Sequence, residues 1–162
     1  PFPYKLYVKE HPSAIGTKPG YFYKKIKEIP NTVLVPPYES VENLIKKSQG
    51  LVVLTSTMGM EAVLASKPVY ALGDVFYDYH PLCRNIDSFK ELRQRIQKDL
   101  VQKPVLENLE NINIRFFVSY FKNTVAGSII AAGSNNDTNN YKAIYKDIVK
   151  IFFKNKDQTK TL

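Results

Sequence analysis

The sequence predicts an α/β protein, with a Rossmann-like parallel sheet flanked by helices and a helical C-terminal extension. Short strand-like runs alternate with segments of helical periodicity over residues 4–73, which is the order expected of βαβ units with right-handed crossovers. In addition, the runs at 32–35, 51–54 and 69–72 are almost wholly apolar, as are strands buried on both faces of a parallel sheet.

Proline and hydroxyl residues mark the limits of these elements. Pro30 and Pro68 stop the helices before them, because proline disfavours the helical conformation for the residue that precedes it. Ser40 is a suitable N-cap for the helix that follows it. The elements expected in this part are strands at 4–9, 32–35, 51–54 and 69–72, and helices at 21–29, 41–47 and 58–65.

Helices and loops are expected after residue 73. An aromatic, polar loop at 74–81 leads to a helix at 87–100, for which Asp87 or Ser88 is the cap. The apolar stripe of that helix consists of Phe89, Leu92, Ile96 and Leu100. A further helix is expected at 112–132.

The composition of residues 133–140, GSNNDTNN, is typical of a flexible linker. It divides the chain into a domain at 1–132, the linker, and a basic amphipathic helix with a tail at 141–162. Over 141–154, lysines recur every four residues on one side of this helix and apolar residues lie on another. Such a helix can lie on an anionic membrane surface, or it can pack against the core or another domain with its lysines in water.

Charge and composition limit the partners. The net charge is +8 and the pI is about 9.4, which favours an anionic partner: a nucleotide, a phosphate, a nucleic acid or a membrane surface. Nucleic acid is not expected, because the lysines are dispersed rather than gathered in one patch with aromatic residues. Cys83 is the one cysteine, so no internal disulfide forms, and no metal-ligand spacing is present. We therefore expect no metal and no cofactor.

Three hydroxyl residues follow the third predicted strand, at 55–57, directly before a helix. In open α/β sheets ligands bind at the carboxyl ends of strands, and a helix start offers free N–H groups to an anion. Ser56 and Thr57 can donate to that anion, Gly59 permits close approach of a ligand, and Glu61 can accept from a sugar hydroxyl. Alternatively, Ser56 or Thr57 only caps the helix and Glu61 only complements its dipole.

His11 follows the first predicted strand, so it should lie at the same carboxyl edge of the sheet as the hydroxyl turn. A histidine can donate to a phosphate in either protonation state. The alternative is a structural hydrogen bond near the strand end. His80 stands in a second His-Pro dipeptide, in the loop after the last clear strand, and is the weaker candidate.

An ordered set of short motifs runs through residues 4–80. They are KEHP at 9–12, STMGMEA at 56–62, KPV at 67–69, Gly73, and FY at 76–77. This set resembles the capsule polysaccharide biosynthesis family, which includes the Kdo transferases of capsule export. More broadly, it resembles the C-terminal, donor-binding half of two-domain GT-B glycosyltransferases, and kindred forms occur in bacterial sialyltransferases with an HP motif.

The resemblance implies a nucleotide-sugar site. His11 would contact the donor phosphate and serve in catalysis by stabilising charge on the departing nucleotide phosphate. Ser56 and Thr57, with the N–H groups near Gly59, would face the same phosphate, and the family does not rank one hydroxyl above the other. Glu61 would hold the ribose hydroxyls. The domain at 1–132 would therefore be a Rossmann-like nucleotide-sugar-binding domain.

In two-domain transferases an N-terminal domain binds the acceptor and usually carries the general base. That half is missing here, and the chain enters a strand at once without an initiator Met, so we expect a piece of a longer protein. Alone, it should bind donor weakly and turn over poorly or not at all. The expected location is the cytoplasm, or the inner face of the membrane as a peripheral protein.

The leading hypothesis is the donor-nucleotide half of a glycosyltransferase that makes capsular or other surface polysaccharide, with a CMP-activated acid sugar such as Kdo as donor. The partners are then the nucleotide sugar and a polysaccharide or glycolipid acceptor. The alternatives are a CDP-polyol phosphotransferase, a UDP-sugar 2-epimerase-like domain, and a non-catalytic binding domain that retains the fold. Preference for CMP, CDP, UDP or no nucleotide distinguishes the four.

Overall fold

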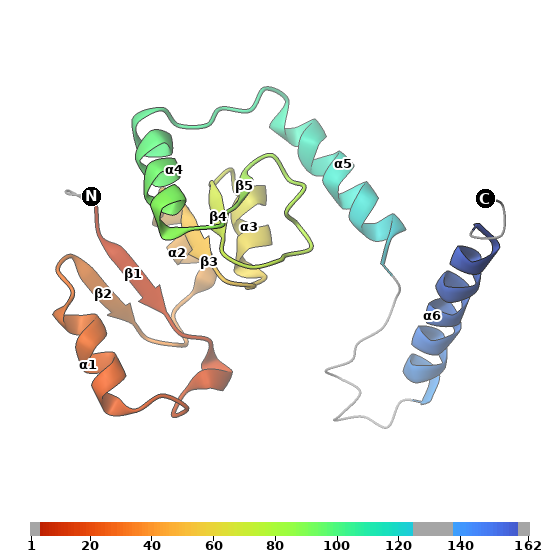
Figure 1. The fold of residues 1–162 in the computed structure, drawn as a ribbon, viewed down its shortest axis with the longest axis horizontal. Helices are drawn as coiled ribbons and strands as arrows, with labels where there is room; N and C mark the ends of the chain where they lie inside the picture. The colour runs from red at the N-terminus through yellow and green to blue at the C-terminus, as the bar shows by residue number, and fades with distance from the viewer. Residues whose placement is uncertain (1–3, 125–137, 159–162) are drawn as a thin grey trace. The chain divides into compact units, whose positions relative to one another are not determined.

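The computed structural model describes residues 4–124 and 138–158 (Figure 1). The chain divides into two compact units, of which one ends at Leu109 and the other begins at Glu110. The first unit alternates strands and helices, and every strand pair in it is parallel. The predicted Rossmann-like α/β class is therefore confirmed.

The first unit opens with a two-stranded parallel sheet. Strand β1 (Leu6–Lys9) pairs with β2 (Thr32–Val35), and the register places Leu6 opposite Thr32 and Lys9 opposite Val35. A 3-10 turn, η1 (Pro12–Ala14), follows β1, and α1 (Gly20–Glu28) connects the two strands. Figure 1 shows α1 beside this pair. Both strands and α1 lie within two residues of their predicted limits.

A second parallel sheet has the strand order β3-β4-β5. Its strands are β3 (Leu51–Val53), β4 (Val69–Ala71) and β5 (Cys83–Asn85), and α3 (Met58–Leu64) connects the first two. The alternation of elements predicted a parallel sheet, and in the described residues the strands form two separate ones. Strand β5 was not predicted, since its three residues include the polar Arg84 and Asn85.

The core of the first unit lies around β4 and the loop that follows it. Val69 and Ala71 on β4 are at most 1% exposed, and Tyr77 and Leu82 in the loop are at most 2% exposed. The loop that the sequence predicts as aromatic and polar thus supplies much of the apolar core. Consequently, β4 is covered on both faces, as its apolar sequence predicted.

Two helices of this unit have the serine caps that the sequence predicted. The Ser40 hydroxyl accepts from Asn43 N–H at the start of α2 (Val41–Lys47), and the Ser88 hydroxyl accepts from Glu91 N–H at the start of α4 (Phe89–Val101). Each cap satisfies a backbone donor that the helix itself leaves unpaired.

The apolar stripe predicted for α4 is wrong in one member. Phe89 is 80% exposed because it is the first residue of the helix, at the end farthest from the contact that holds α4 in place. That contact is polar: the Tyr70 hydroxyl donates to the buried Asp99 carboxylate at 2.9 Å, and Arg84 lies 3.5 Å from the same oxygen. Burial and the Asp99 carboxylate raise the pKa of Tyr70.

The second unit contains α5 (Leu109–Lys122), whose first residue closes the first unit, and α6 (Thr138–Gln158). The helix predicted at 112–132 ends at Lys122, and the prediction is wrong for Asn123 and Thr124, which are not helical; its part from residue 125 lies outside the described residues. Residues 133–137 of the predicted linker also lie outside the described residues, whereas residues 138–140 of it are helical, because α6 begins at Thr138. The domain limits stay a prediction. In the described ranges, no helix is both long and apolar enough to cross a bilayer.

Candidate functional site

A groove of about 1990 Å³ runs through the first unit, and both sheets contribute to its walls. Four of the predicted site residues line it: His11, Ser56, Thr57 and Glu61. They come from the segments that follow β1 and β3, which are the two strand ends that the sequence predicted to open on one edge. The fifth predicted residue, Gly59, is not among the lining residues.

His11 is exposed and caps the turn η1. Its Nδ1 accepts from the backbone N–H of Ser13 at 3.2 Å and lies 2.7 Å from the Ser13 hydroxyl. Because Nδ1 accepts from an N–H, the neutral imidazole carries its proton on Nε2. The local turn therefore leaves His11 with an Nε2–H donor on a side chain that lines the groove.

A polar cluster that the sequence did not reveal orders the loop beside His11. The Glu10 carboxylate accepts from the Tyr23 hydroxyl at 2.8 Å and from the Lys18 ammonium at 3.1 Å. The Tyr23 hydrogen bond, and after it Lys18, hold the pKa of Glu10 below its ordinary value against the opposing effect of burial. These partners are eight and thirteen residues away, a spacing that carries no sequence signal.

The hydroxyl turn uses its two candidate residues differently. The Ser56 hydroxyl accepts from Met58 N–H at 3.3 Å, so it caps the start of α3, as the structural alternative predicted. Thr57 is the residue at the N-cap position, is exposed, and makes no side-chain cap hydrogen bond. Both hydroxyls keep a proton that can be donated, since Ser56 uses only an acceptor lone pair in its cap bond. Glu61 is exposed and lies in the first turn of α3.

Gly59 is buried, and packing gives one reason for glycine there. A Cβ at this position would lie 2.1 Å from the Tyr77 hydroxyl oxygen. The missing side chain makes room for Tyr77, whose hydroxyl donates to the Ser56 carbonyl at 2.6 Å, and the predicted ligand contact at Gly59 stays a prediction. Burial raises the pKa of Tyr77 to about 12. Tyr77 and Gly59 together support the hydroxyl turn from its buried side.

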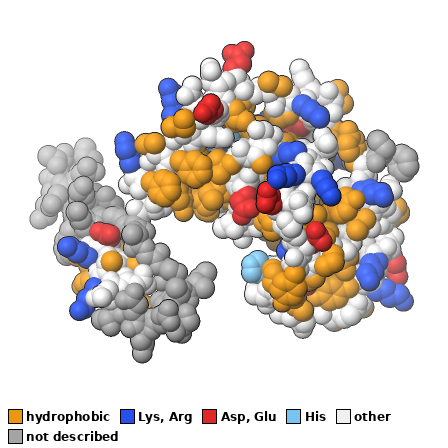
Figure 2. Space-filling model, turned by 180° about the vertical axis from the view of Figure 1, so that it is seen from behind, with side chains coloured by type: hydrophobic (Ala, Val, Ile, Leu, Met, Phe, Trp, Pro, Cys, Tyr) orange, Lys and Arg blue, Asp and Glu red, His pale blue; other side chains and the backbone are white. Residues whose placement is uncertain are grey.

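Two lysines tie the walls of the groove to backbone carbonyls. Lys9 donates to the Pro37 carbonyl at 2.5 Å, which joins the end of β1 to the loop after β2. Lys67 donates to the Ser48 carbonyl at 2.8 Å and thereby holds the end of α2. Both ammonium groups shape the groove rather than stand free in it. On the face shown in Figure 2, other Lys and Arg side chains are scattered among apolar surface.

The remaining candidates lie outside the groove. His80 is only 1% exposed, and its Nδ1 accepts from Leu82 N–H at 3.2 Å, so it is a core residue. Burial raises the pKa of the Cys83 thiol to about 11. Within residues 4–124 and 138–158, His, Cys, Asp and Glu form no group of three that could hold a metal ion.

Residues 1–118 match the family model described as capsule polysaccharide biosynthesis protein. The chain belongs to the capsule polysaccharide biosynthesis family. The match covers both sheets and all the residues that line the groove, and it continues into α5. No curated protein and no solved structure matches the chain. Membership in this family gives the chain a role in the biosynthesis of capsular polysaccharide.

Proposed function

We propose that this chain is the donor-nucleotide-binding half of a glycosyltransferase of capsule synthesis, and that its donor is a CMP-activated acid sugar such as Kdo. The observation that carries the proposal is the groove: residues from the ends of two strands of different sheets line it together. They supply a neutral or cationic donor in His11, a free-standing hydroxyl in Thr57, and a carboxylate in Glu61. A nucleotide sugar needs this combination, since it presents phosphate oxygens and ribose hydroxyls.

In this proposal each residue has one task. The Nε2–H of His11 donates to the donor phosphate and stabilises the charge that grows on the departing nucleotide. The hydroxyl of Thr57 donates to the same phosphate, while Ser56 keeps the turn in shape through its bond to Met58. The carboxylate of Glu61 accepts from a ribose hydroxyl.

The acceptor site and the general base are not assigned to this chain. In the two-domain transferases that the sequence resembles, they belong to another domain. We therefore expect the chain alone to bind nucleotide and to transfer sugar poorly or not at all. A transfer assay needs the two domains together.

Calorimetric titration with CMP, CDP and UDP tests the proposal. CMP should bind most tightly, and His11→Ala and Glu61→Ala should each weaken it by about tenfold or more, the loss expected for a hydrogen bond to a charged group. Glu39→Ala is the matched control, because Glu39 is exposed and lines the same groove without belonging to the proposed set. Its affinity for CMP should equal that of the unaltered chain.

The other nucleotides separate the alternatives. Preference for CDP would favour a polyol phosphotransferase, and preference for UDP an epimerase-like site. Absence of binding by the chain, repeated with the acceptor-binding domain present, would favour a non-catalytic domain. Equal weakening by Glu39→Ala would show that the groove, but not the proposed residues, recognises the nucleotide.

A further inference from the structure

We propose that α6 is a membrane-surface helix, which lies in the plane of an anionic lipid headgroup layer with its apolar side inserted. This inference concerns the second unit and does not depend on which nucleotide the first unit binds. It rests on the chemistry of the two sides of one helix, Thr138–Gln158.

The described part of α6 carries two exposed lysines one helical turn apart. The lysines of the sequence in this helix recur every four residues, at 142, 146, 150 and 154. In an α-helix, residues four apart lie on the same side, so this spacing predicts a lysine row, and Lys142 and Lys146 are its described members. The side chains of Lys142 and Lys146 are exposed, and neither forms an ion pair within the part of the chain that the structure describes.

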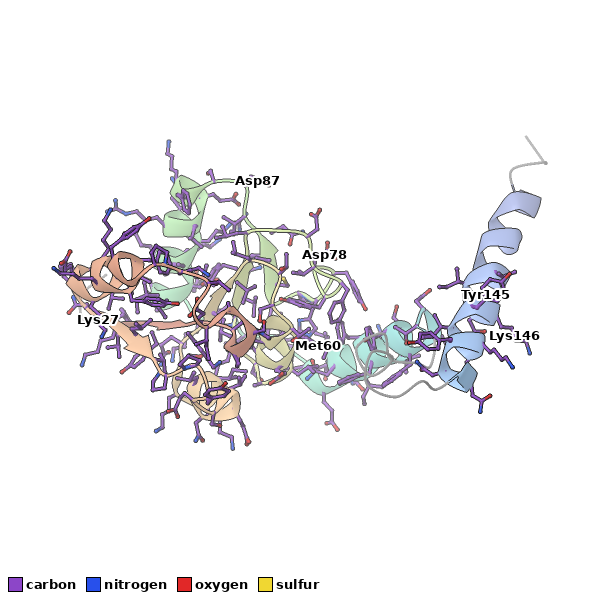
Figure 3. All side chains as sticks on the ribbon, turned by 90° about the horizontal axis from the view of Figure 1, so that it is seen from below. Lys27, Met60, Asp78, Asp87, Tyr145 and Lys146 are labelled. Carbon is purple, nitrogen blue, oxygen red and sulfur yellow. The ribbon has the colours of Figure 1, made fainter. Side chains whose placement is uncertain are left out.

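Two residues on the apolar side of α6 are exposed in its described part. Tyr145 is 70% exposed, and Ile148, three residues further along, is 51% exposed. Figure 3 shows Tyr145 and its neighbour Lys146 on this helix, and their adjacent positions mark the border between the apolar side and the lysine row. Exposed apolar side chains on one side of an amphipathic helix are a candidate interaction surface.

Charge complementarity favours lipid as that partner. A row of lysines that continues through several turns matches a plane of negative headgroups, which offers charge wherever the helix lies. Tyrosine suits the same boundary, because its ring is apolar and its hydroxyl remains in water, and tyrosine is enriched at membrane–water interfaces. A helix of this kind lies on the bilayer and does not cross it.

Flotation of the whole chain with vesicles tests the inference. The chain should float with vesicles of phosphatidylcholine mixed with phosphatidylglycerol and should remain unbound with phosphatidylcholine alone. Added salt should reduce the bound fraction, since it screens the lysine–headgroup attraction. Lys142→Glu with Lys146→Glu should lower the apparent vesicle affinity at least about tenfold, because each lysine contributes near the surface. Tyr145→Ser with Ile148→Ser should lower the affinity for the vesicles that contain phosphatidylglycerol at every salt concentration.

The matched control is Lys90→Glu with Lys98→Glu, which makes the same charge change on the exposed side of α4 in the first unit. It should keep the vesicle affinity of the unaltered chain. Circular dichroism checks that every variant keeps its helix content. Failure to bind anionic vesicles, or equal loss in the control and the α6 variants, overturns the proposal. So would a defined dimer, seen by sedimentation, that buries Tyr145 and Ile148 and remains in the presence of vesicles.

Discussion

The two His-Pro dipeptides of this chain have the same local geometry and different surroundings. In each, the Nδ1 of the histidine accepts from the backbone N–H two residues further on, at 3.2 Å: Ser13 for His11 and Leu82 for His80. His11 is exposed and lines the groove, whereas His80 is 1% exposed in the core. The dipeptide thus specifies the turn, and the rest of the fold decides whether its imidazole meets a ligand or the core.

Substitution of His80 should give the largest effect on stability. His80→Ala leaves a cavity and an unpaired Leu82 N–H in the core, and we expect a loss of about 3 kcal/mol in the free energy of unfolding. Urea denaturation measures it. Nucleotide affinity of the folded fraction should stay the same, and a loss of affinity without a loss of stability would reverse the roles of the two histidines.

Gly59→Ala should also destabilise, because the new methyl group would overlap the Tyr77 hydroxyl. Overpacking of a buried contact costs about 1–3 kcal/mol, again measured by urea denaturation. Gly20→Ala is the control, since a Cβ there meets nothing within 4 Å. If the Gly59→Ala variant had the same free energy of unfolding as the unaltered chain, the loop around Tyr77 would have moved to make room for the methyl group. The hydroxyl turn would then not depend on the contact between Gly59 and Tyr77.

His11→Ala should have the opposite profile to His80→Ala. Its free energy of unfolding should change by less than about 0.5 kcal/mol, as for most exposed positions, while CMP affinity falls about tenfold. Denaturation and calorimetry on the same preparation give both values. A large loss of stability would show that His11 is a structural residue like His80, and the proposed difference between the two histidines would be wrong.

Glu10 should give the smallest effect, visible as a pH dependence. Its pKa is lower in the folded chain than the ordinary value of 4.5, so it stabilises the fold above that value. This contribution disappears as the pH falls through the folded pKa. The unaltered chain should therefore lose more stability than Glu10→Gln on acidification, in denaturation curves recorded over that range. Parallel curves would mean that Tyr23 and Lys18 do not bind the carboxylate in solution.

Features of the fold that depend on neighbouring residues could be predicted from the sequence. The strand at 32–35 is present with the predicted limits, and both Ser40 and Ser88 cap the helices expected after them. These signals are local: apolar runs set strands, and a hydroxyl before a helix satisfies its first N–H groups. His11, Ser56, Thr57 and Glu61 line one groove, as the sequence predicted, although the strands before them belong to two separate sheets rather than to one.

Features that depend on distant residues could not be predicted. Strand β5 exists because Cys83 and Arg84 pair with Val69 and Tyr70 on β4, and nothing in its own three residues requires a strand. The fit of Gly59 against Tyr77 joins positions eighteen residues apart, and the sequence around Gly59 does not indicate this packing contact. In each case the partner, rather than the segment itself, determines the structure.

The uneven burial of the first unit has a consequence for its motions. In the fully described β1 and α1 no residue is buried, and β2 has Val35 alone, whereas all of β4 is buried. Segments with few buried contacts open at lower free energy, so amides of β1 should exchange with deuterium sooner than those of β4. His11 follows β1, in the part of the groove wall that opens more easily, and Glu61 lies on α3, in the part that is more firmly packed. The groove would then adjust to a ligand mainly by movement of the β1 side.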